Sequence, residues 1–150
     1  MKVNFLQDDN LNDNEILVTV NAPKLSNDVI DLIHKLEIME NSNNDNLSIY
    51  YHDKFIMIKQ SNIVAVEVLK TTLTIYTIKD VYEINGSLKN IVNKLNNYFV
   101  QISKCAIINV NHLKSMETAF SGNMTAFLTN DIKMNVSRKY LPNLKKILGI

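Results

Sequence analysis

Short stretches rich in β-branched and aromatic residues, spread from residue 47 to residue 136, are the feature that most constrains how this chain can fold. Each stretch alternates in polarity or is apolar throughout, and each ends at a turn signal such as Asn85-Gly86-Ser87. We therefore predict a mainly β domain of roughly ten strands, of sandwich or barrel type. The predicted strands are 47–51, 55–58, 63–69, 72–78, 80–84, 99–102, 106–110, 113–120, 124–129 and 132–136.

Two helices are expected within this β domain. Leu88, Ile91, Val92 and Leu95 outline a short amphipathic helix that Ser87 can cap, inserted between two groups of strands. The second helix is expected over 139–148, at the C-terminal end. It has Pro142 in its first turn, Ser137 as a possible cap and Gly149 as a stop signal.

The first 45 residues have a different pattern. Residues 3–6 and 16–20 are expected to be strands, and apolar residues recurring between 25 and 39 predict a helix. Together they predict a small α+β leader of ββα order. The polar stretch 41–46, N-S-N-N-D-N, is the linker candidate. We therefore expect two domains, residues 1–45 and 46–150.

Charge separates the same two parts. Residues 1–45 hold three lysines and nine acids, a net charge of −6, whereas residues 46–150 hold thirteen lysines or arginines and six acids, a net charge of +7. A basic domain that follows an acidic leader is typical of a module that binds a polyanion, although it also fits an ordinary solvated surface.

The sequence contains few residues in the patterns that enzymes use for catalysis or metal binding. Cys105 is the single cysteine, so no intramolecular disulfide can form, and His34, His52 and His112 lack partners at metal-ligand spacing. The three glycines stand singly at turns, so the sequence has no glycine-rich phosphate loop. We expect no catalysis, metal, cofactor or small-molecule substrate. The absence of a long apolar run and of a signal-peptide pattern predicts a soluble, cytoplasmic protein.

The basic residues of interest stand where strands join or break. They lie at Lys70-Thr71-Thr72, at Ser103-Lys104 and at Ser137-Arg138-Lys139. Loops at one end of aligned strands can offer such donors to phosphates and base edges. On spacing alone, an ordinary surface role for these lysines is about as good an interpretation.

Three segments of the sequence resemble the LytTR family of bacterial DNA-binding domains. They are F-V-Q-I-S-K-C-A-I-I-N-V-N-H-L-K-S-M (residues 99–116), the hairpin signal S-G-N-M (121–124) and M-N-V-S-R-K-Y-L-P-N-L-K-K (134–146). The resemblance extends over about residues 47–150. It implies a ten-stranded, mainly β fold whose loops, in place of a recognition helix, enter successive major grooves of double-stranded DNA.

Carried over by position, the family's contacts fall on the loop near Lys70, on Gln101 and Lys104, and on Arg138. Arg138 would donate two bonds to a guanine, and Gln101 would read an adenine or bind a phosphate. Lys104 and Lys139 would neutralise phosphates. Asn109, inside an apolar strand, is interpreted as structural.

The resemblance also bears on partners. The leader resembles that of small stand-alone family members. We expect this chain to bind as a homodimer to a promoter with paired short repeats. The leader lacks the residue pattern of a phosphorylated receiver, so we expect control by a partner protein, with a membrane-bound protein as one candidate.

Two other functions stay open. The chain could be a protein-interaction module whose leader docks a partner, or an enzyme that uses the Cys105 thiol.

Overall fold

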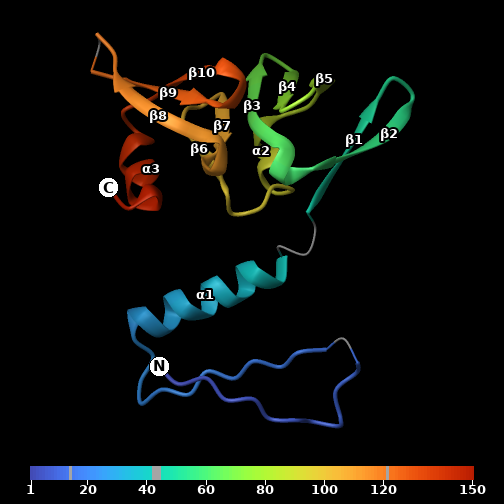
Figure 1. Cartoon of the computed structure of the whole chain (residues 1–150), viewed down its shortest axis with the longest axis vertical. Helices are drawn as coiled ribbons and strands as arrows, with labels where there is room; N and C mark the ends of the chain where they lie inside the picture. The colour runs from blue at the N-terminus through green and yellow to red at the C-terminus, as the bar shows by residue number, and fades with distance from the viewer. Residues whose placement is uncertain (14, 42–44, 121) are drawn as a thin grey trace. The chain divides into compact units, whose positions relative to one another are not determined.

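A chain of antiparallel hairpins accounts for most of the structure. The computed structural model describes residues 1–13, 15–41, 45–120 and 122–150, and within these residues it contains ten strands and three α-helices (Figure 1). The strands are β1 (Asn46–Tyr51), β2 (Lys54–Lys59), β3 (Ile63–Leu69), β4 (Thr72–Thr77), β5 (Val81–Asn85), β6 (Phe99–Gln101), β7 (Ala106–Asn109), β8 (Leu113–Thr118), β9 (Met124–Leu128) and β10 (Lys133–Val136). The helices are α1 (Asn27–Asn41), α2 (Leu88–Val92) and α3 (Leu141–Leu148), with 3₁₀ turns at Gln60–Asn62, Val110–His112 and Thr129–Asp131.

Every strand predicted between residues 47 and 136 is confirmed, with ends that differ by one or two residues. The strands form a two-stranded sheet (β1-β2), a five-stranded sheet in the order β5-β4-β3-β7-β6 and a three-stranded sheet in the order β10-β9-β8. All of the pairings are antiparallel. The mainly β fold expected from the sequence is therefore present.

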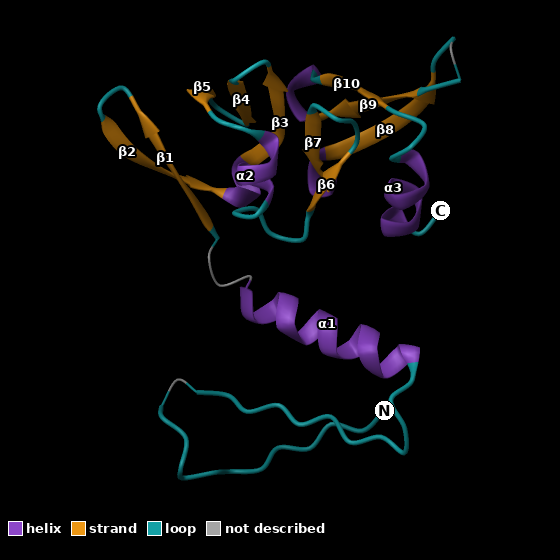
Figure 2. Ribbon diagram, turned by 180° about the vertical axis from the view of Figure 1, so that it is seen from behind, coloured by secondary structure: helices purple, strands orange, loops and turns teal. Residues whose placement is uncertain are grey.

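The central strands β3 and β7 of the five-stranded sheet are buried on both faces over most of their length, which explains their apolar runs. In β7, Ala106 and Ile108 belong to a core shared with the three-stranded sheet and α3, whereas Ile107 belongs to a second core shared with the β1-β2 hairpin and α2. Figure 2 shows these two groups on opposite sides of the five-stranded sheet. The central strands can therefore keep little polar surface except at their ends.

The two helices of this domain begin by different means. The Ser87 hydroxyl accepts a hydrogen bond from the Asn90 amide (3.2 Å), which confirms the predicted cap of α2. The predicted cap of α3 is wrong. That helix starts at Leu141, and Ser137 uses its backbone carbonyl to accept from the amides of Tyr140 (2.9 Å) and Leu141 (3.1 Å), so it forms a turn before the helix.

The leader differs from the predicted ββα unit. Its helix is confirmed as α1, but residues 3–6 and 16–20 form no strand. Side chains in both segments stay exposed, Phe5 at 89% and Ile16 at 86%. A strand pairing is stable only where its side chains pack against neighbours. Because these side chains are exposed, the two segments do not form strands.

The chain separates into two compact units, residues 1–37 and 38–150. The domain division at residues 45 and 46 stays a prediction. Residues 42–44 of the predicted linker lie outside the described residues.

Candidate nucleic-acid interface

The turn between β3 and β4 carries the first group of predicted contact residues. Leu69 pairs with Thr72, so Lys70 and Thr71 form the two-residue connection, and both side chains are exposed. Thr72 begins β4 and is half-buried. Lys70 has a φ of 57°, a left-handed conformation that costs energy for a residue with a Cβ. The turn therefore holds a lysine in a strained position at the end of the sheet.

The loop between β6 and β7 carries the second group. Buried Ile102 anchors it, and its amide donates to the carbonyl of Ala106 (3.0 Å). The Ser103 hydroxyl accepts from the Cys105 amide (3.1 Å), and the Gln101 amide nitrogen donates to the Ser103 carbonyl (2.9 Å). These local bonds shape a tight loop that leaves the Lys104 side chain exposed.

The connection between β10 and α3 carries the third group. Val136 is fully buried and ends β10, after which Arg138 and Lys139 are exposed. The Lys139 ammonium lies 5.9 Å from the centre of the Tyr140 ring. The buried strand end thus presents two neighbouring cations at the surface.

Two backbone hydrogen bonds link the loop 101–105 to the end of β3, just before Lys70, and to the connection after β10. The Val68 amide donates to the Cys105 carbonyl (2.8 Å), and the Ser137 amide donates to the Ile102 carbonyl (2.8 Å). We call segments 70–72, 101–105 and 137–139 the three-loop surface. All eight predicted contact residues lie on it, although their binding roles stay predictions. These residues are Lys70, Thr71, Thr72, Gln101, Ser103, Lys104, Arg138 and Lys139.

The acid on β3 that comes just before this surface, Glu67, is engaged with a neighbouring strand. Its carboxylate accepts a hydrogen bond from the Tyr76 hydroxyl (3.1 Å). Burial of Tyr76 and then the charge of Glu67 raise the pKa of this hydroxyl, which therefore stays protonated and keeps donating.

Buried amides organise the other end of β7. The Asn109 side-chain nitrogen donates to the Ile63 carbonyl (3.0 Å), and its oxygen accepts from the Asn111 amide (3.0 Å). Gln60, also buried, donates to the Lys94 carbonyl (3.0 Å) and accepts from the Asn96 amide (2.7 Å). The structural interpretation of Asn109 is therefore confirmed, whereas the role of Gln60 was missed.

The turn between β8 and β9 also reaches this surface, which sequence reasoning did not foresee. Gly122 lies so close to Arg138 that a Cβ on it would be 3.0 Å from a terminal guanidinium nitrogen. The available signal was a lone glycine within a hairpin. Ser121, part of the same hairpin signal, lies outside the described residues.

No group of three His, Cys, Asp or Glu among the described residues could hold a metal ion. Cys105 is exposed. His112 instead contacts the Ser61 carbonyl (2.7 Å) and the Thr129 hydroxyl (3.0 Å) through its two ring nitrogens. No helix in the described part of the chain is long and apolar enough to cross a membrane.

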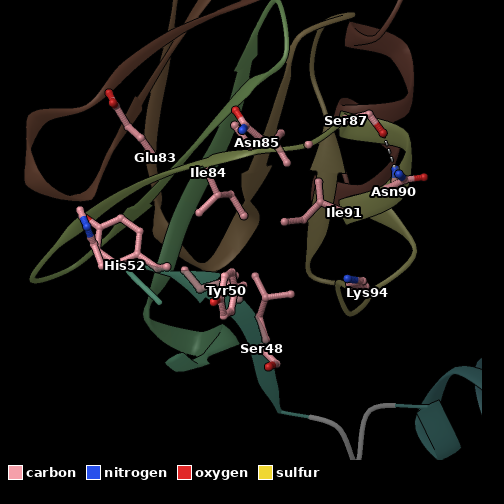
Figure 3. A pocket seen from close by; sticks show the side chains of 15 residues that line it. Ser48, Tyr50, His52, Glu83, Ile84, Asn85, Ser87, Asn90, Ile91 and Lys94 are labelled. Carbon is pink, nitrogen blue, oxygen red and sulfur yellow. Dashed lines mark hydrogen bonds between the residues drawn. The ribbon is translucent and has the colours of Figure 1, made fainter. Parts of the chain in front are cut away.

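A groove of about 540 Å³ lies between β1, the end of β5 and α2 (Figure 3). Ile84 and Ile91 face into it, while the Glu83 carboxylate points away from Ile84. The groove adjoins the three-loop surface, because the Gly86 amide donates to the Thr71 carbonyl (2.9 Å). The sequence could not indicate it, since its walls come from separate elements.

Comparison with known proteins gives consistent matches. The family model described as the LytTr DNA-binding domain matches residues 53–149. The transcriptional regulatory protein LytR of Staphylococcus aureus (strain N315) is 32% identical over 105 residues, which are 69% of this chain and 43% of that protein. An uncharacterized HTH-type transcriptional regulator of Staphylococcus aureus is 25% identical over 151 residues, covering 100% of this chain and 99% of that protein.

A solved structure matches as well. The LytTr DNA-binding domain of a Bacillus cereus response regulator has a TM-score of 0.63 at 20% identity, covering 71% of this chain and 98% of that one. This likeness shows the fold. The chain spans less than half of the LytR relative, 43% of its length.

Proposed function

The chain belongs to the LytTR family of DNA-binding domains, and from this membership we propose that it is a sequence-specific transcription regulator that binds double-stranded DNA through the three-loop surface. The observation that carries the proposal is the pair of backbone hydrogen bonds, Val68 to Cys105 and Ser137 to Ile102, at 2.8 Å each. They hold together loops that are far apart in sequence. Their cations can therefore reach one stretch of duplex.

The residues of this surface take different roles in the proposal. Arg138 reads a guanine through O6 and N7, since its guanidinium offers two parallel donors. Lys70, Lys104 and Lys139 neutralise phosphates and set the register. Thr71, Thr72 and Ser103 add hydroxyl donors near the same backbone.

The proposed contact of Gln101 with DNA depends on a rearrangement of its side chain. Its amide nitrogen already donates to the Ser103 carbonyl (2.9 Å), so contact with DNA through this donor exchanges one hydrogen bond for another. We propose that Gln101 contacts an adenine or a phosphate only after its loop meets the major groove. Its contribution to affinity is then smaller than that of Arg138.

The rest of the proposal concerns assembly and control. We propose a cytoplasmic homodimer on paired short repeats, with the leader serving for dimerisation or regulation. The relative that matches over the full chain includes this leader and is described as a transcriptional regulator, which supports the proposal. Control by a partner protein, with a membrane protein as one candidate, is proposed in place of phosphorylation.

A protein-interaction role of the leader is the second candidate. The observation that favours it is the set of large apolar side chains exposed on residues 1–37, including Val3, Phe5 and Leu17 at 85%, 89% and 68%. Such exposure is typical of a surface that binds another protein or a second copy.

Selection of bound sequences from random duplex DNA by the full chain tests the main proposal. We expect enrichment of a motif with one guanine whose preference is lost in Arg138→Ala, at a cost of about 1–3 kcal/mol in specific binding. Lys79→Ala serves as the matched control, because this exposed lysine lies in the turn that follows β4, at the opposite end of that strand from Lys70 and Thr71. Absence of any enriched motif with the wild-type protein would contradict the proposal.

A further inference from the structure

The β8-β9 turn is closed tightly around a glycine. The Ala119 amide donates to the Asn123 carbonyl (2.8 Å), and the Gly122 amide donates to the Ala119 carbonyl (3.2 Å). Gly122 has a φ of 75°, which a residue with a Cβ adopts only at a cost. The backbone conformation of this turn therefore favours glycine.

The same glycine is needed for a second reason, which is its contact with Arg138. A Cβ at Gly122 would lie 3.0 Å from one terminal nitrogen of the guanidinium and 3.6 Å from its Cζ and Nε atoms. The guanidinium thus lies within van der Waals reach of the position that a Cβ would take on this glycine. A side chain at this position would therefore require the terminal nitrogen of the guanidinium to shift by a few tenths of an ångström.

Bidentate reading of a base depends on the orientation of the guanidinium as well as on its charge. An arginine that leaves the protein surface through several rotatable bonds must lose that freedom on binding, unless a neighbouring surface already restricts it. The backbone of the β8-β9 turn offers such a surface. It comes from the strand pair next to β10, since β9 pairs with both β8 and β10.

We propose that Gly122 is a positioning residue for Arg138, so that the β8-β9 turn is a fourth element of the DNA-binding surface and sets base specificity without touching the base. This inference rests on the proposed function. The role of the turn is to orient the Arg138 guanidinium. The charges of the surface do not indicate this role, because glycine contributes no charge and no side-chain donor.

Two substitutions to asparagine separate the contact from the backbone strain. Asparagine tolerates a left-handed φ better than other residues with a Cβ, so Gly122→Asn keeps the turn but adds a Cβ against Arg138. Gly149→Asn is the matched control, because Gly149 has the same φ of 75° and a Cβ there would meet nothing within 4 Å.

The experiment compares binding of the full chain to its selected site, to the same site with the Arg138-dependent base pair exchanged, and to unrelated DNA. We expect Gly122→Asn to lower the preference for the correct base pair about tenfold, with little change on unrelated DNA. Gly149→Asn should keep the wild-type preference. In an Arg138→Ala background, Gly122→Asn should have no further effect.

Several results would overturn the inference. One is an unchanged preference in Gly122→Asn when Arg138→Ala abolishes it, and another is an equal loss with and without Arg138. A third test needs no variant at Gly122. NMR relaxation of the Arg138 Nε–H bond in the wild-type protein should give an order parameter above the flexible range, which lies below about 0.6, and a value within that range would contradict positioning.

If the wild-type chain shows no sequence preference, the proposed function is contradicted. If it shows a preference that Gly122→Asn leaves unchanged, only the inference about Gly122 is contradicted. The two failures are therefore distinguishable.

Discussion

The exposed cations of the three-loop surface are chemically unequal. Arg138 presents a planar fork, which suits a base edge, whereas Lys104 is a flexible point charge that suits a phosphate. The Lys104 side chain projects from a loop fixed by bonds to Ser103 and Ala106, so its charge stays near the surface even though the side chain itself can move. Specificity and affinity should therefore respond to different residues.

Lys104→Ala should weaken binding to all duplexes about equally, because the contact it removes is to phosphate. We expect the slope of the logarithm of the binding constant against the logarithm of salt concentration to become shallower by about 1. Fluorescence anisotropy over a range of salt concentrations measures this slope. A loss confined to the selected site would instead assign Lys104 to base reading.

The element that joins β3 to β4 shows a conflict between stability and the proposed function. Lys70 has a left-handed φ of 57°. Asp53, in the β1-β2 turn, has a similar φ of 61°. Such conformations are held by the surrounding hairpin and cluster at functional sites. The energetic cost of the left-handed Lys70 is therefore offset in function only if its charge contacts DNA phosphate.

Lys70→Asn should raise the free energy of unfolding by up to about 1 kcal/mol, because asparagine accepts the left-handed conformation more readily. The same change should weaken DNA binding, since one phosphate contact is lost. Asp53→Asn is the control: aspartate already tolerates the left-handed conformation, so we expect little change in urea unfolding and no loss of DNA binding. Full DNA affinity in Lys70→Asn would remove this turn from the interface.

The strands of the β domain and the segments of the leader had similar apolar patterns but different outcomes. The strand 106–110 was predicted from its apolar run and is buried in β7, whereas 16–20 was predicted in the same way and is exposed. The difference is tertiary, because a strand persists where neighbours bury its side chains. The pattern of the leader alone could not reveal that its apolar side chains stay exposed in the described part of the chain.

At the scale of the whole molecule, both cores of the β domain are made of residues from 47 to 148. Among the described residues, the sheets, α2 and α3 therefore bury their apolar faces against one another. This arrangement supports the proposed division of the chain into a leader and a DNA-binding domain.

A chain starting at Asn46 should therefore unfold cooperatively at nearly the same urea midpoint as the full chain. If the leader dimerises, the shortened chain should keep its affinity for one half-site and lose the extra affinity for paired repeats. Sedimentation and binding to single and paired sites measure both. Loss of cooperative unfolding would show that the leader belongs to the core.

The sequence by itself determined the number and order of the strands in the β domain, its two helices and the positions of its loop cations. These features follow from local patterns of polarity, turn residues and caps, which act over a few neighbouring residues. It also identified Asn109 as structural, because an amide inside an apolar strand needs nearby partners.

Only the tertiary structure decided which loops meet. The bonds from Val68 to Cys105 and from Ser137 to Ile102, and the contact of Gly122 with Arg138, join residues distant in the chain. Such contacts depend on how three sheets pack and on the register of their strands, which one-dimensional patterns do not specify. Charge placement suggested the surface, and packing of the sheets brought its parts together.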